Sequence, residues 1–349
     1  MNSKIFVNGT KSDIVTVVIP VYNGEHKLSD CLEAVFKSDY PNFEVIVVDD
    51  NSSDKTAYVA QQYPCKVVRL SSNSGPAVAR NKGVEHAKGD YILFIDDDVI
   101  IQRQTISRIV LNFQKDESIS AQVGNLIKEN GFSNFFSQFK NLHHRYHLCS
   151  FPDYIKITFT TITAVKKCDF IKIKGFNSII NTASVEDIEF GQRLTDNGFK
   201  ILHDKNLYVV HQKHYSLKSY FKNTLNRSYC HFKLFLINRG FFRLKNDNKV
   251  VYFPKSTVVS FLLGPVILLL FPVLFILDIF KGFAVFTLLL LLFAFLNKGF
   301  LIYLLKNKGF SFAISACFVV LVDSWILSIG SSFALMDIYL GKKRKWKLI

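Results

Sequence analysis

Three consecutive carboxylates stand directly after an apolar run, and their spacing suits a metal ion. Residues 91–95 are typical of a buried strand, and Asp96, Asp97 and Asp98 follow at once. Neighbouring carboxylates about 5 Å apart repel by roughly 3 kcal/mol at an effective dielectric constant of about 20. Because side chains alternate along an extended chain, Asp96 and Asp98 share one side and Asp97 points away. A hard divalent cation that carries a phosphate group would fit this pair, and a solvated turn is the alternative.

Alternating strands and helices position these acids. Apolar β-branched runs predict four strands over the first 100 residues, and helical spacing predicts helices between them. The predicted strands are 15–20, 43–50, 65–70 and 91–96, and the helices are 27–38, 53–63 and 75–87. This alternation indicates a parallel sheet covered by helices, an α/β fold that binds ligands at the carboxyl ends of its strands. The pair Asp49 and Asp50 falls at the same edge as residues 96–98.

The stretch from residue 100 to 215 is less regular. We predict helices at 104–114, 134–148 and 185–200, and a strand at 157–165. Glu186 and Asp187 lie in the first turn of the last helix, where negative charge suits the helix dipole. The group His143, His144 and His147 lacks the glutamate of a zinc-protease helix, so we expect a partly exposed helix rather than a metal site.

Composition limits the partners of the chain. The 349 residues include 43 Lys and Arg against 28 Asp and Glu, a net charge of +15. No zinc-finger spacing or RNA-binding aromatic motif occurs, so nucleic acid is not an expected partner. Anionic membrane lipid accounts better for the charge, because apolar segments follow. The six cysteines contain no CxxC pair and are expected to be reduced, in the cytosol.

The sequence resembles the family 2 glycosyltransferases and their GT-A fold, a Rossmann-like, mostly parallel sheet with flanking helices. The resemblance covers about residues 14–235 and rests on "VTVVIPVYNGEHK", "FEVIVVDDNSSDKT" and "NSGPAVARNKGVEHAKGDYILFIDDDV". It implies transfer of a sugar from a nucleotide-diphosphate sugar, with UDP favoured, in the presence of Mn²⁺ or Mg²⁺. The implied acceptor is a lipid-linked or other saccharide in bacterial surface polysaccharide synthesis.

The resemblance also implies roles for single residues. The donor would contact, from the uracil end to the sugar, Pro20, Tyr22, Glu25, Asp50, Asn73, Gly75, Arg80 and Asp97. The metal ligands would be Asp96, Asp98 and His211, and the acceptor segment would contain Gly175, Phe176 and Glu186. Asp187 would be the general base. Structural alternatives are an Asx-turn for Asp50, a surface position for Arg80, a helix cap for Asp187 and a packed side chain for His211.

One departure from the family concerns chain extension. Processive members carry a Gln-x-x-Arg-Trp motif, whereas the two tryptophans here are Trp325 and Trp346, near the C-terminus. We therefore predict non-processive transfer of one sugar with inversion. A nucleotidyltransferase and a catalytically inactive nucleotide-sugar-binding scaffold are the alternative functions. This chain has no basic glycine-rich loop directly after its first predicted strand, which argues against a nucleotidyltransferase. The intact Asp96, Asp98 and Asp187 argue against an inactive scaffold.

The C-terminal part predicts a membrane anchor. We expect a glycosyltransferase domain at 1–214, a basic amphipathic interfacial linker at 215–255 and a membrane domain at 256–349. Two crossings are predicted, at 256–277 and about 283–304, with 310–340 re-entrant or interfacial. The basic tail after residue 340 is expected on the cytosolic face of the inner membrane. The N-terminal domain is expected on the same face, because residues 1–20 contain no apolar stretch long enough for a signal peptide.

Overall fold

The computed structural model describes residues 13–238, 262–267 and 279–341, together with positions 259, 269, 270 and 276. Within them the chain forms two compact units. The first contains residues up to 131 and 148–213, and the second contains 132–147 and the chain from 214 on. The expected segments are 1–214, 215–255 and 256–349, whereas 132–147 belongs to the second unit because it packs with the C-terminal helices.

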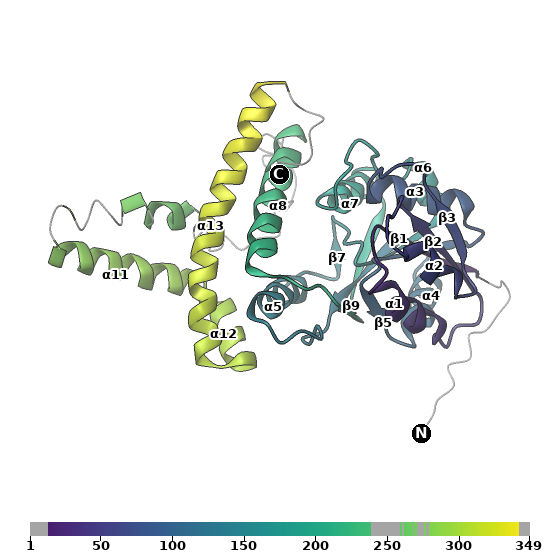
Figure 1. Cartoon of the computed structure of the whole chain (residues 1–349), viewed down its shortest axis with the longest axis horizontal. Helices are drawn as coiled ribbons and strands as arrows, with labels where there is room; N and C mark the ends of the chain where they lie inside the picture. The colour runs from purple at the N-terminus through teal and green to yellow at the C-terminus, as the bar shows by residue number, and fades with distance from the viewer. Residues whose placement is uncertain are drawn as a thin grey trace. The chain divides into compact units, whose positions relative to one another are not determined.

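The first unit is built on one nine-stranded sheet in the order β3-β2-β1-β4-β8-β6-β9-β5, with β7 beside β9. Its strands are β1 (Val15–Val21), β2 (Phe43–Asp49), β3 (Lys66–Arg69), β4 (Tyr91–Ile95), β5 (Val99–Ile101), β6 (Ile119–Leu126), β7 (Tyr154–Ile155), β8 (Ile162–Lys166) and β9 (Lys200–His211). The four predicted strands pair in parallel. The α/β fold class is thereby confirmed (Figure 1).

The second half of the sheet mixes directions. Strand β8 is antiparallel to both β4 and β6, and β9 runs parallel to β6. The strand expected at 157–165 begins only at Ile162, because residues before it contact the start of helix α7 through Thr158 and Thr160. Strands β6 and β9 were not predicted. Their positions matter, because the last residue of β9, His211, pairs with Val99 of β5, directly after the acidic turn.

Helices cover this sheet. They are α1 (Leu28–Phe36), α2 (Thr56–Gln61), α3 (Pro76–His86), α4 (Thr105–Lys115), α6 (Lys167–Lys172) and α7 (Glu186–Asp196). In α3, Gly83 faces β1 so closely that an added Cβ would lie 2.3 Å from Val18. The fully buried apolar side chains of β1, β2 and β4 form the core against these helices. Burial of that apolar surface is the main stabilising term.

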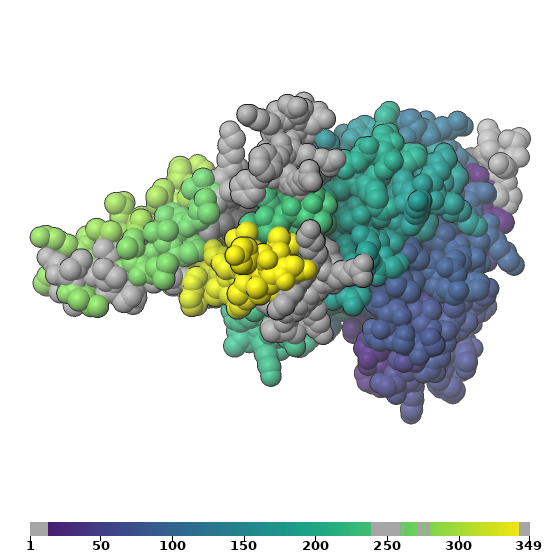
Figure 2. All heavy atoms as spheres, turned by 90° about the horizontal axis from the view of Figure 1, so that it is seen from above, coloured from purple at the N-terminus to yellow at the C-terminus, as the bar shows by residue number. Residues whose placement is uncertain are grey.

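The second unit consists of helices α5 (Phe135–Cys149, up to 147), α8 (Leu217–Ile237), α11 (Ile279–Leu296), α12 (Lys298–Lys308) and α13 (Phe310–Tyr339). Helix α8 begins at a capping box formed by Ser216 and Ser219. Phe139, Tyr220, Phe300 and the apolar side chains of α13 share one core. Helix α11 extends away from the α8–α13 pair, as the green segment shows (Figures 1 and 2).

Among the described residues, α13 is the one unbroken helix long and apolar enough to cross a membrane. Only 28% of its most apolar window is buried, unlike a core helix. The sequence predicts 310–340 as re-entrant or interfacial, so that the number of crossings is even, whereas the structure forms one continuous helix there. Asp323 and Asp337 within it accept hydrogen bonds from Tyr220 and Tyr229 of α8.

The expected crossing at about 283–304 falls on a bent pair of helices. Helices α11 and α12 meet at a bend of 76° at Asn297. They are long and apolar enough to cross a membrane only if the two bent helices together form one span. The expected crossing at 256–277, the linker after residue 238 and the basic tail lie largely outside the described residues.

Candidate active site

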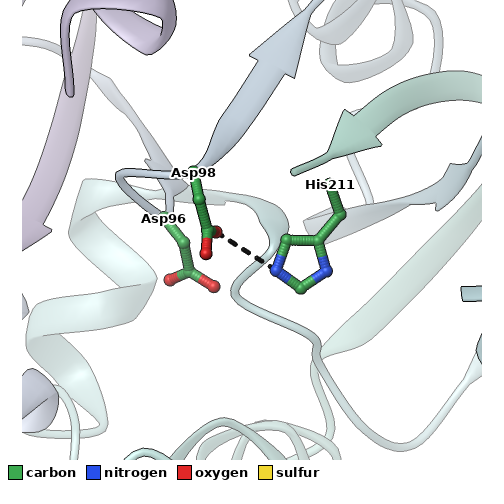
Figure 3. Close-up of side chains that lie close together, drawn as sticks. All are labelled: Asp96, Asp98 and His211. Carbon is green, nitrogen blue, oxygen red and sulfur yellow. Dashed lines mark ion pairs between the residues drawn. The ribbon is translucent and has the colours of Figure 1, made fainter. Parts of the chain in front are cut away.

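The turn between β4 and β5 carries Asp96, Asp97 and Asp98, and β9 ends beside it at His211. One ligand atom each from Asp96, Asp98 and His211 lies within 4.8 Å of the others. Figure 3 shows these three side chains directed toward one another, two from the turn and one from β9. The pairing of Val99 with His211 places them there. The structure thus joins residues more than 100 positions apart into one cluster.

The hydrogen-bonding state of this cluster fits a metal ion. His211 Nε2 lies 3.1 Å from Asp98 Oδ1, at ion-pair distance. Yet neither that nitrogen nor either oxygen of Asp98, all buried, has an aligned hydrogen-bond partner. Buried polar atoms rarely lack a hydrogen-bond partner, and a bound cation would satisfy all three of these atoms. The two carboxylates suit a hard divalent cation such as Mn²⁺ or Mg²⁺, and the imidazole is a ligand typical of transition metals.

Two lysines were missed in the sequence. Lys27 Nζ lies 3.8 Å and Lys213 Nζ 3.5 Å from Asp98 Oδ2. Burial opposes ionisation of Asp98, but His211, Lys213 and Lys27 outweigh it and hold its pKa well below the usual value. Lys213 stands two positions after His211, and Lys27 two after Glu25, which is the signal that could have indicated them.

Asp97 differs from its two neighbours. Its Oδ2 faces Gly24, where an added Cβ would lie only 2.4 Å away. Burial and the charge of Asp98 raise the pKa of Asp97 to about 6, against the effect of Lys27. Asp97 is thus separated from Asp96 and Asp98, but a turn at 97–98 separates them rather than the alternation of an extended strand.

Arg80 connects the acidic turn with helix α7. Its guanidinium is 2% exposed and lies 2.8 Å from Asp96 Oδ1 and 2.9 Å from Glu186 Oε1. Burial disfavours the charged form, but Asp96, Glu186 and Asp187 raise the pKa of Arg80 above its ordinary value. The alternative of a surface residue does not hold for this buried side chain.

Glu186 and Asp187 differ in accessibility. Glu186 is 3% exposed, and its second oxygen accepts a hydrogen bond from Ser184 N at 2.8 Å. This geometry favours a supporting role over contact with an acceptor. Asp187 is half-buried and accepts from Thr160 N at 3.3 Å, while its own carbonyl accepts from Thr158 Oγ1. Those two threonines were not predicted either.

Gly175 and Phe176 support the site from behind. Gly175 has φ +63°, and Phe176 is 2% exposed, stacked on Phe190 at 4.4 Å between ring centroids. The Arg80 guanidinium carbon lies 5.6 Å from the Phe176 ring centroid. The structure therefore brings Phe176 to Arg80 rather than to an open acceptor surface.

A second cluster of loops lies after β1 and β2. Tyr22 is 51% exposed, and Glu25 Oε2 accepts from Lys55 N at 2.8 Å. Asp50 is buried, and its two oxygens accept from Ser74 N at 2.7 Å and Gly75 N at 2.8 Å. Its carboxylate thus holds the loop before α3.

The remaining predicted donor residues divide between surface and core. Asn73 is exposed and Pro20 is buried within β1. Gly75 has φ +89°, and an added Cβ would meet the Asn181 carbonyl oxygen at 2.4 Å. Only glycine combines that backbone conformation with so close an approach.

Comparisons with known proteins agree with this arrangement. Residues 16–172 match the family described as glycosyl transferase family 2. The poly(ribitol-phosphate) beta-glucosyltransferase of Bacillus spizizenii is 35% identical over 125 residues, 34% of this chain and 20% of that protein. The UDP-Glc:alpha-D-GlcNAc-diphosphoundecaprenol beta-1,3-glucosyltransferase WfgD of Escherichia coli is 37% identical over 90 residues, 25% of this chain and 36% of WfgD. Both matches therefore span well under two thirds of the relative.

A solved structure shows the same fold. The mannosyltransferase PcManGT from Pyrobaculum calidifontis, in complex with GDP-Man and Mn²⁺, superposes with a TM-score of 0.56 at 17% identity. The superposition covers 94% of this chain and 88% of that one. At this identity the likeness concerns the fold.

Proposed function

From the match of residues 16–172 to glycosyl transferase family 2, we propose that the chain transfers one sugar from a nucleotide-diphosphate sugar to an acceptor hydroxyl. The observation that carries the proposal is the cluster of Asp96, Asp98 and His211, tied through Arg80 to Glu186 and the adjacent Asp187. Donor chemistry and proton acceptance need such groups close together.

The donor is a UDP-sugar in this proposal. Two relatives transfer glucosyl units, and the name of one specifies UDP-Glc. The loops that hold Tyr22, Glu25 and Asp50 stand at the carboxyl ends of β1 and β2, where α/β sheets bind nucleotides. Lys27 and Lys213 add positive charge beside Asp98 for the diphosphate.

Asp96, Asp98 and His211 would hold Mn²⁺ or Mg²⁺. Bound there, the cation would act as a Lewis acid that neutralises charge on the leaving diphosphate. Arg80 keeps Asp96 oriented, because the guanidinium bond fixes one carboxylate oxygen. The Lys27 and Lys213 ammonium groups both approach one oxygen of the other carboxylate, Asp98 Oδ2.

Asp187 would accept the proton of the acceptor hydroxyl. The acceptor oxygen forms a bond to the anomeric carbon, the bond from that carbon to the diphosphate oxygen breaks, and the proton passes to the Asp187 carboxylate. A single displacement of this kind inverts the anomeric configuration. Thr160 N and Ile188 N orient the carboxylate by hydrogen bonds to its two oxygens.

The acceptor is a lipid-linked saccharide in this proposal, and the enzyme acts at the cytosolic face of a membrane. The apolar helix α13 supports attachment, and WfgD is named for a diphosphoundecaprenol acceptor. Transfer is non-processive, since the chain lacks the Gln-x-x-Arg-Trp motif.

The test compares two variants of the full chain in detergent with a matched control. We expect Asp187→Asn to lower UDP release by about 10²–10⁴-fold and to leave UDP–Mn²⁺ binding intact. Asp98→Asn should abolish metal-dependent UDP binding. Asp196→Asn, an exposed acid on the same helix as Asp187, should change neither. Normal turnover by Asp187→Asn would disprove the base assignment, and activity in EDTA would disprove the metal role.

A further inference from the structure

A cluster of basic and imidazole side chains lies inside the second unit, apart from the acidic site. Lys140, His143 and His147 follow one another on α5 at spacings of three and four, and Arg227 and His231 are four apart on α8. Residues three and four apart share one face of a helix. Each helix therefore presents a basic stripe.

Ring and hydrogen-bond contacts show how the stripes are packed. Lys140 Nζ lies 5.2 Å from the Tyr220 ring centroid, so the α5 stripe meets α8. His143 and His147 have their Nε2 atoms 3.2 Å apart, and the His143 ring lies 5.1 Å from that of Phe300. Lys140 and His143 thus lie against aromatic rings, where a charge or polar atom without a partner costs free energy.

The cations lack sufficient counter-charge. Burial and the charge of Arg227 lower the pKa of Lys140 to about 8, and burial, Arg227 and Lys140 lower that of His231 to about 3. Asp323 is the carboxylate that acts on Lys140, and it already accepts a hydrogen bond from Tyr220. Within the described part of the chain, neither Lys140 nor Arg227 has an ion-pair partner.

One buried imidazole nitrogen of this cluster makes no hydrogen bond within the described part of the chain. His231 Nε2 is buried and has no hydrogen-bond partner among the described residues. Buried polar atoms are satisfied by protein, water or ligand in the great majority of cases. Two cations and an unpartnered imidazole nitrogen together have the composition of an anion site.

We propose that Lys140, Arg227 and His231 bind the phosphate group of a lipid, and specifically the diphosphate of a lipid-linked acceptor. The specific form rests on the proposed transferase function. A guanidinium matches two phosphate oxygens with a planar pair of donors, and an ammonium adds a point charge. The hydrogen bond from Tyr220 to Asp323 attaches this cluster to α13, the helix apolar enough to cross a membrane.

The experiment measures binding without catalysis. The full chain in a nonionic detergent, in EDTA and without donor, is titrated calorimetrically with farnesyl diphosphate and separately with short-chain phosphatidylglycerol. The variant Lys140→Gln/Arg227→Gln removes both cations. The control Lys218→Gln/Lys222→Gln removes equal charge from exposed positions of α8.

We expect wild type and control to bind farnesyl diphosphate alike, and the cluster variant to bind at least about tenfold more weakly. A loss confined to farnesyl diphosphate identifies the acceptor diphosphate as the ligand. An equal loss toward phosphatidylglycerol supports the phosphate site and assigns it to membrane lipid. Equal affinity of the cluster variant and the control, or no binding by wild type, overturns the proposal.

Stability and catalysis are controlled separately. If the cluster variant loses its thermal transition, Arg227→Lys replaces it, which keeps the charge and removes the planar donor pair. The affinity of Arg227→Lys for farnesyl diphosphate should fall severalfold while its melting temperature stays that of wild type. An unchanged affinity overturns the proposal. Because no donor is present, this outcome does not depend on UDP release, whose absence would instead disprove the transferase function.

Discussion

Arg80 offers the sharpest test of how the site is held together. Replacing it by Met removes two ion pairs, to Asp96 at 2.8 Å and to Glu186 at 2.9 Å. The Asp96 side chain is 29% exposed and retains water, whereas that of Glu186 is 3% exposed and does not. The loss therefore resides mainly in the stranded Glu186 carboxylate.

The expected magnitude follows from that burial. Removing one partner of a buried pair costs about 3–5 kcal/mol, a large part of the roughly 5–15 kcal/mol that stabilises a domain. Adding Glu186→Gln removes the stranded charge, so the double variant should regain at least about 2 kcal/mol. Arg80→Lys should retain only part of the free energy of unfolding that Arg80→Met loses, because one ammonium group cannot reproduce both guanidinium hydrogen bonds.

The assay is native-state hydrogen exchange of amides in α3 and β4, followed by mass spectrometry, because it reports the first unit alone. Lys82→Met is the control on the same helix. Its ion pair with Glu85 is exposed at both ends, so it should cost below about 1 kcal/mol. Additive effects of Arg80→Met and Glu186→Gln, or equal effects of Arg80→Met and Lys82→Met, would refute this reasoning.

Three further predictions concern the rest of the chain. Gly75→Ala should destabilise the first unit by more than about 1 kcal/mol, because φ is +89° and its Cβ would clash, and a fall in melting temperature checks this. Burial raises the pKa of Asp204, but Arg108 and the other hydrogen-bond donors hold it below its usual value, so the ion pair stabilises the folded state above about pH 4 and loses this effect as the pH falls. Asp204→Asn should therefore flatten the acid side of a curve of unfolding free energy against pH. Tyr229→Phe should lower the melting temperature of the second unit by removing a 2.6 Å hydrogen bond to Asp337, whereas unchanged melting would show that the bond contributes little.

Local pattern alone determined the first half of the sheet and one edge of the site. β-Branched runs and intervening helical spacing predicted β1 to β4 within a few residues, because buried parallel strands need continuous apolar sequence. The three aspartates after β4 were placed at the binding edge for the same reason. The family resemblance pointed to His211 and Asp187, which no local pattern distinguishes from a packed histidine or a helix cap.

The tertiary structure decided which distant residues meet. The antiparallel insertion of β8 and the pairing of β5 with β9 bring His211 to Asp98. The bond from Arg80 to Glu186 spans 106 positions, and the hydrogen bond from Tyr220 to Asp323 spans 103. Strand order and helix pairing depend on the burial of whole faces, and each partner sequence taken separately carries no record of the other. For that reason the acids were visible in the sequence, while the arginine and lysines that neutralise them were placed only by the fold.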